Sequence, residues 1–133
     1  MFGYAAGLPA FLLYFVLGLV LYALFSLVYT AITPHKEFAL IREGNVAAVT
    51  AFGGTILGFS LPLASAAANS VSIFDFIIWS VIGAIAQLLA FYAASATMKG
   101  LADRITRGEV AAGVWGAAVA LSVGILNAAC MTY

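Results

Sequence analysis

Charge is scarce in this sequence. Only 8% of its 133 residues are Asp, Glu, Lys or Arg, whereas soluble domains carry roughly 25%. Hydrophobic residues make up 65% of the chain and its mean hydropathy is +1.16, so too few polar side chains remain to cover a soluble surface. The composition therefore predicts one integral membrane domain over residues 1–133.

Cysteine and histidine are scarcer still, with one of each, Cys130 and His35. This excludes an internal disulfide and a zinc site built from His and Cys. We expect Cys130 to be a small packed residue near the outer face, with a bridge between two copies as the alternative. His35 is expected at the surface or in a helix cap, with a pH-responsive role as the alternative.

The patterns of catalysis and of nucleic-acid binding are also absent. No glycine-rich phosphate loop follows a strand, and no serine has a His and Asp set to activate it. Five scattered basic residues cannot form a surface that tracks phosphates. The sequence therefore predicts a protein that is not an enzyme, holds no cofactor or metal and has no nucleic-acid partner.

Long apolar runs are what the sequence has in abundance. Each can cross roughly 30 Å of hydrocarbon, and each must be helical because lipid offers no partners to exposed backbone groups. The predicted fold is all-α with four transmembrane helices, over residues 8–32, 46–68, 76–98 and 110–133. Because residues 1–7 contain no Lys or Arg, we expect the first run to be a retained helix and not a signal peptide.

All five basic residues lie in the two linkers that follow the first and third spans. Loops rich in Lys and Arg face the cytoplasm, so both linkers are predicted to be cytoplasmic and both termini outside. In a bacterium this is a multi-pass protein of the inner membrane. The linker residues are Lys36, Arg42, Lys99, Arg104 and Arg107.

The chain also looks duplicated. Residues 41–48 align with residues 105–112 at an offset of 64, with Ile, Gly, Val, Ala and Ala identical in place. We predict two tandem helix-hairpin repeats, over about 8–68 and 73–133, in parallel and not inverted topology. Chance recurrence of small residues is the alternative.

The repeated junctions have a capping interpretation. Gly44 and Gly108 permit the left-handed turn that stops a short helix, and Asn45 and Glu109 then begin the second and fourth spans. The alternative is that Asn45 and Glu109 line a cytoplasmic vestibule for a small ligand.

The first short helix is expected to begin earlier in the linker. Thr33 would cap it and Pro34 would take its first position. Glu37 would then lie on its polar side, away from the apolar face formed by Phe38 and Ile41.

Small and polar residues within the spans suggest how the helices meet. Gly53, Gly54 and Gly58 predict close packing of the second span against the fourth, which is similarly rich in small residues, within a chain or between chains. The glycines of the fourth span are Gly113, Gly116 and Gly124. Four polar residues are either hydrogen-bonding glue between helices or the lining of a pathway. These are Gln87, Thr50, Thr55 and Asn127. No ionisable residue lies in the centre of a span, which argues against a carboxylate proton relay.

A family resemblance rests on two segments. Thr33 to Ala48 reads T-P-H-x-E-x-x-L-I-R-x-G-N-x-A-A, and Gly54 to Pro62 reads G-x-x-x-G-x-x-x-P. With Gln87, this pattern resembles the YjfL-like family of small bacterial inner-membrane proteins. The resemblance implies a membrane location, a duplicated helical fold and a link to membrane-stress systems, and it carries no catalytic or ligand residues.

Two functional hypotheses remain. The first is an oligomeric channel or transporter for a small ion or polar solute, with Gln87, Thr50, Thr55 and Asn45 as candidate lining. A dimer or larger assembly is expected, because four helices close around their own side chains. The second is a non-catalytic membrane anchor or assembly factor in an envelope-stress system, whose basic linkers dock a cytoplasmic protein or anionic lipid.

The predicted orientation is testable with a membrane-impermeant thiol reagent. In intact cells the reagent should label Cys130 from outside and should not label a cysteine placed in the first linker. Replacing the linker Lys and Arg residues by Gln should weaken this asymmetry. Labelling of the linker cysteine alone would show that the orientation is reversed.

Overall fold

Six helices make up residues 2–131, the part of the chain that the structure, a computed structural model, describes. Four are long: α1 (Phe2–Ile32), α3 (Val46–Asn69), α4 (Ile73–Thr97) and α6 (Val110–Cys130). Two helices of six residues, α2 (Glu37–Arg42) and α5 (Leu101–Thr106), lie in the linkers. Each long helix has the length and apolarity to cross a membrane. The predicted all-α fold with four candidate spans is therefore confirmed.

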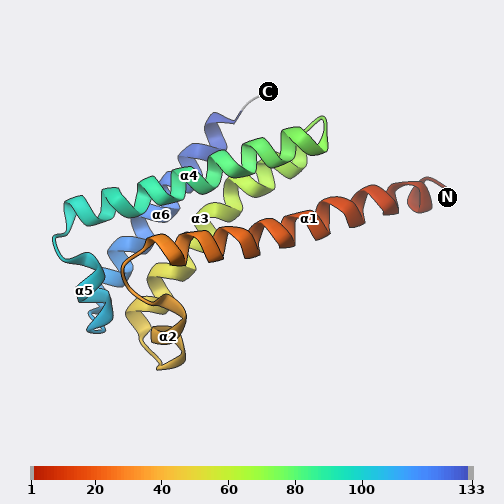
Figure 1. Cartoon of the computed structure of the whole chain (residues 1–133). Coiled ribbons are helices and arrows are strands. Elements are labelled where there is room, and N and C mark those ends of the chain that lie inside the picture. The colour runs from red at the N-terminus through yellow and green to blue at the C-terminus, as the bar shows by residue number, and fades with distance from the viewer. Residues whose placement is uncertain (1, 132–133) are drawn as a thin grey trace.

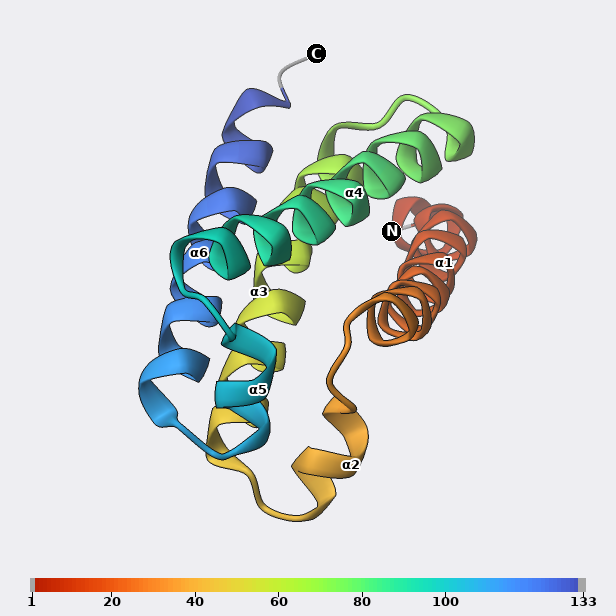
Figure 2. The ribbon, with the colours of Figure 1, turned by 60° about the vertical axis from the view of Figure 1, so that its left-hand side comes forward.

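The centre of the molecule is the pair α3 and α6, which lie side by side and run in the same direction (Figures 1 and 2). Helix α4 packs against both of them, and α1 runs in the same direction as α4 at the outside of the bundle. Helices α2 and α5 lie at one end of the molecule, and the turn between α3 and α4 lies at the other (Figure 1).

Two glycines of α3 let its backbone touch that of α6. A Cβ added to Gly54 would stand 2.5 Å from the Cα of Ala117, and one added to Gly58 would stand 2.5 Å from the carbonyl oxygen of Ala120. Real Cβ atoms do not approach other atoms this closely. The close approach of the two helices therefore requires glycine, which has no side chain, at both positions.

Helix α6 contributes glycines of its own to this contact. Gly113 faces the backbone of Ala47, and Gly124 faces the backbone of Gly58. The close approach is therefore made within one chain. The sequence also predicts a packing role for Gly53, but a Cβ there would meet nothing within 4 Å. It lies on another side of α3 and takes no part in the contact.

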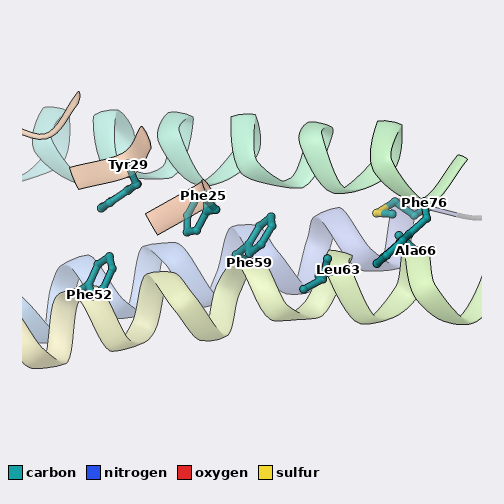
Figure 3. Packing of buried hydrophobic residues seen from close by; sticks show 8 residues of the cluster. Phe25, Tyr29, Phe52, Phe59, Leu63, Ala66 and Phe76 are labelled. Atoms are coloured by element: carbon teal, nitrogen blue, oxygen red, sulfur yellow. The ribbon is translucent and has the colours of Figure 1, made fainter. Parts of the chain in front are cut away.

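Helix α1 contacts the bundle through one aromatic face (Figure 3). The ring of Phe25 stacks on that of Phe59 with centroids 4.3 Å apart, and Tyr29 lies 6.0 Å from Phe52. Most of the remaining side chains of α1 are exposed apolar groups, including Phe11, Phe15, Leu24 and Leu27. An apolar face of this length suits lipid or a neighbouring copy.

The two linkers end in the same backbone motif. Gly44 (φ 83°) follows α2 and Gly108 (φ 81°) follows α5. Each glycine N–H donates to the carbonyl three residues earlier, and the N–H of Asn45 or Glu109 donates to the carbonyl five residues earlier. Glycine is favoured here because its left-handed backbone costs no Cβ clash.

The offset of 64 that relates the two sequence segments also relates these elements. It carries the bounds of α2 onto those of α5, and the first residue of α3, Val46, onto that of α6, Val110. The two halves thus share an element order and a junction, and the duplication itself stays a prediction.

The glycine contact predicts opposite outcomes for two neighbouring substitutions. Gly54→Ala should destabilise the fold by about 1–3 kcal/mol, because its Cβ would force α3 and α6 apart. The matched control Gly53→Ala should stabilise it by up to about 1 kcal/mol through helix propensity. Thermal unfolding of both variants in detergent measures the difference. Equal unfolding temperatures for the two variants would contradict the described packing.

Candidate functional site

Gln87 is buried near the middle of α4. Its Nε2 donates a 3.1 Å hydrogen bond to the carbonyl oxygen of Ala120 on α6. Its Oε1 is buried and has no hydrogen-bond partner among the described residues. Gln87 therefore links two helices and still offers one unused acceptor.

The other three polar residues predicted as helix glue or pathway lining lie in three different places. Thr50 is half-buried and donates at 2.8 Å to the carbonyl of Val46 in its own helix. Thr55 is buried and faces α1. Asn127 is half-buried on α6, and its Oδ1 lies 3.6 Å from the position of a Cβ on Gly83, one turn before Gln87. Thr50 is thus separate from Gln87, whereas Asn127 lies against α4 one turn before Gln87.

Asn45 joins the two linkers. Its side-chain oxygen accepts from the N–H of Ala48 at 3.0 Å, as expected for a cap. Its Nδ2 donates to the carbonyls of Ile105 and Thr106 at 2.9 and 3.2 Å. These bonds engage both ends of the Asn45 amide without any ligand.

Glu109 occupies the N-cap of α6 but makes no side-chain capping bond. Its carboxylate instead pairs with Arg104 at 3.3 Å and with Arg107 at 3.0 Å. The second linker therefore partly neutralises its own charge. The other basic linker residues are exposed: Lys36, Arg42 and Lys99.

A buried polar cluster lies between the end of α1 and the start of α2. It consists of Thr33, His35 and Glu37, which are 6%, 7% and 1% exposed, and we call it the linker cluster. The Thr33 hydroxyl donates to the Glu37 carboxylate, whose two oxygens lie 2.7 and 2.9 Å away. Nε2 of His35 lies 3.7 Å from Oε1 of Glu37.

The linker cluster corrects two predictions about the start of the short helix. Thr33 does not cap it, because α2 begins at Glu37 with Lys36 at the N-cap and no side-chain capping bond. The Thr33 hydroxyl is committed to Glu37 and to the carbonyl of Tyr29. Pro34 accordingly lies in the turn before α2 and not in its first position.

The predicted exposure of His35 and Glu37 is also wrong. The ring of His35 lies 5.9 Å from that of Phe91, so α4 packs over it. Glu37 lines a cavity together with Leu101 and Ile105 of α5. Packing of the second linker and of α4 over the first linker thus removes both side chains from water.

The cavity beside the linker cluster has a volume of about 10 Å³, enough for one water molecule. Tyr29 and Thr55, whose hydroxyl oxygens lie 3.4 Å apart, line it together with His35 and Glu37. Nδ1 of His35 is buried and has no partner among the described residues. The cavity also reaches Ala120, whose carbonyl accepts the hydrogen bond of Gln87.

Burial shifts the protonation of both ionisable groups toward their neutral forms. Loss of water raises the pKa of the Glu37 carboxyl above its usual value of 4.5, and the Thr33 hydroxyl partly offsets this by stabilising the carboxylate. Burial lowers the pKa of His35 below its usual 6.5. The site therefore disfavours an isolated charge on either group. It favours a state in which a charge on one group would be compensated by the other.

The sequence contained a signal for this cluster. Thr33, His35 and Glu37 occupy alternate positions, and a proline disfavours the helical conformation for the residue before it. Alternate side chains of a non-helical stretch point to one side. A helix that begins at Pro34 would not place these alternate side chains on one side, so the expected helix does not predict the cluster.

The raised pKa of Glu37 predicts a pH dependence of stability. A folded protein that holds this proton more tightly than the unfolded chain loses stability as the pH rises through the folded-state pKa. Glu37→Gln should flatten that loss above pH 4.5, and the matched control Glu43→Gln, which alters an exposed carboxylate of the same linker, should not. Thermal unfolding in detergent across pH measures it. Identical profiles for wild type and Glu37→Gln would contradict the burial of this group.

The chain is similar in sequence to known bacterial proteins. The family model described as Domain of Unknown Function (DUF350) matches residues 3–131. The UPF0719 inner membrane protein YjfL of Escherichia coli strain K12 is 44% identical over 126 residues, which cover 95% of this chain and 96% of that protein. The protein of the same name from Escherichia coli O157:H7 matches to the same extent. No solved structure matches the chain. The resemblance found in residues 33–62 is confirmed, and the chain belongs to the family described as Domain of Unknown Function (DUF350).

Proposed function

We propose that this protein is a multi-pass protein of the bacterial inner membrane that transports a small ion or small polar solute. Four apolar helices and the inner-membrane name of its relatives support the location. The observation that carries transport is the linker cluster beside its cavity. Burying a carboxylate and an imidazole is costly, and a pair of buried titratable groups beside a cavity is a candidate functional site.

The proposed orientation places both linkers in the cytoplasm. Helices α2 and α5 share one end of the molecule (Figure 1), and all five basic residues belong to the linkers at that end. The matching offsets of the linker helices and glycine turns support a duplicated hairpin in parallel topology. The linker cluster then lies at the cytoplasmic side, where a solute from the cell interior would enter.

The proposed route follows buried polar groups from the linker end into the bundle. It starts at His35 and Glu37 and passes the hydroxyls of Tyr29 and Thr55. The cavity reaches Ala120, so Gln87 is the next polar side chain along the route. The unused Oε1 of Gln87 and Oδ1 of Asn127 supply further acceptors toward the opposite end.

We further propose that the working unit is a homo-oligomer. The backbone contact at Gly58 and Gly124 leaves no central opening between α3 and α6. Helix α1 touches the bundle along one face and exposes apolar side chains elsewhere. A second copy packed against the exposed apolar side chains of α1 would remove them from lipid.

A second candidate function is a membrane anchor that docks a cytoplasmic partner. The exposed Lys36, Arg42 and Lys99 favour it, because they are available to an acidic protein surface or to anionic lipid. This candidate gives no role to the buried linker cluster, and we therefore rank it second.

Flux through liposomes that contain purified protein tests the transport proposal. A panel of small cations and anions should reveal selective flux, and Gln87→Leu should change its rate by roughly tenfold, equivalent to about 1.4 kcal/mol. The control Leu89→Ala alters an exposed position of the same helix and should leave the flux unchanged. Oligomer size is measured in parallel to show that each variant assembles. Absence of any flux with folded, assembled protein would favour the anchor function instead.

A further inference from the structure

The size of the cavity limits what the linker cluster can bind. Its volume of about 10 Å³ holds one water molecule and no larger solute. A hydrated metal ion or an organic molecule would need the packed side chains of Phe52 and Phe91 to move, since both line the same space.

The donor atoms do not match a metal site. Among the described residues, no group of three or more His, Cys, Asp and Glu side chains could hold a metal ion. One carboxylate and one imidazole are present, and the two carboxylate oxygens of Glu37 already share the hydroxyl of Thr33. A bare cation would face few charged ligands in a site with little water.

Some polar atoms of the linker cluster lack hydrogen-bond partners. One bound proton and one water molecule would supply the missing hydrogen bonds. The 3.7 Å between Nε2 of His35 and Oε1 of Glu37 is too long for a hydrogen bond. Nδ1 of His35 has no partner among the described residues. A water in the cavity beside them has donors and acceptors enough to bond to either group.

Apart from His35 and Glu37, no charged side chain among the described residues lines the cavity. Tyr29 of α1 is the one further titratable residue among those that line the cavity. Helix α3 contributes Thr55, α4 contributes Phe91 and Ala94, and α5 contributes Leu101 and Ile105, none of which is charged. The charge state of the site is therefore set by His35 and Glu37 themselves.

We infer that the ion bound by the linker cluster is the proton, held jointly by His35 and Glu37 with one water in the adjoining cavity. This inference rests on the proposed transport function and names its substrate class. In the uptake step a hydronium ion from the cytoplasmic side gives its proton to the Glu37 carboxylate, forming one O–H bond, and leaves as water. Because no ionisable residue lies in the centre of a span, we assign onward transfer to the hydroxyls of Tyr29 and Thr55, which line the same cavity, and not to a relay of carboxylates.

Proton flux into liposomes that enclose a pH-sensitive dye tests this inference. A potassium gradient with valinomycin supplies the driving potential, and parallel vesicles report sodium and chloride flux. Wild type and the control Glu43→Gln should carry protons. Glu37→Gln and His35→Gln should reduce proton flux by roughly tenfold or more, with oligomer size unchanged.

A third variant keeps the test decisive if removal of either ionisable group prevents folding. Thr33→Val leaves both groups in place and removes the hydroxyl that stabilises the Glu37 carboxylate. It should therefore move the pH midpoint of proton flux upward. An unmoved midpoint in folded Thr33→Val would overturn the assignment of Glu37.

The ion panel separates the two levels of the proposal. Sodium or chloride flux without proton flux would support transport and overturn the proton as substrate. Proton flux that is equal in wild type and Glu37→Gln would overturn the linker cluster as its binding site. No flux of any ion would overturn the inference and, with it, the ion as the substrate of the proposed transport.

Discussion

The close contact between the backbones of α3 and α6 is the constraint on which the rest of the structure depends. In lipid, apolar side chains gain little by leaving their surroundings, so helices associate through close packing and interhelical hydrogen bonds. Gly54 and Gly58 on α3, with Gly113 and Gly124 on α6, allow that packing. Helix α4 then covers both helices, and Gln87 bonds to the Ala120 carbonyl across the joint. Helix α1 adds an aromatic face and leaves most of its surface outside.

The same contact explains why polar groups are buried at the linker end. Because α3 and α6 begin side by side, the short helices that precede them are drawn together, and Asn45 bonds to the carbonyls that end α5. Helix α5 and Phe91 of α4 then pack over the first linker. Glu37 and His35 are thereby removed from water, and Nδ1 of His35 has no hydrogen-bond partner among the described residues. A stable fold alone would be better served by apolar residues there, and this cost is why we propose a functional role for the cluster.

Periodicity and turn chemistry predicted most of the fold. The four spans, the glycine stops at Gly44 and Gly108 and the cap at Asn45 follow from local rules. The linker cluster does not, because its burial depends on α4 and α5, which are distant in sequence. Local rules predict that Thr33 and Pro34 begin the short helix and that Glu37 lies on its polar side. In the structure the helix begins at Glu37, and tertiary packing buries that side chain. Gly53 shows the same limit, since sequence cannot say which glycine of a run faces the neighbouring helix.

The central claim is that Glu37 is a buried carboxyl that holds a proton under conditions where an exposed glutamate has lost it. Infrared spectroscopy of the protein in lipid across pH measures this directly, through the carbonyl band of a protonated carboxyl group. A raised pKa of the Glu37 carboxyl predicts a band that persists above pH 4.5, is absent in Glu37→Gln and remains in Glu43→Gln. A wild-type protein whose carboxyl bands all titrate at the ordinary glutamate value, or whose persistent band survives Glu37→Gln, would contradict it.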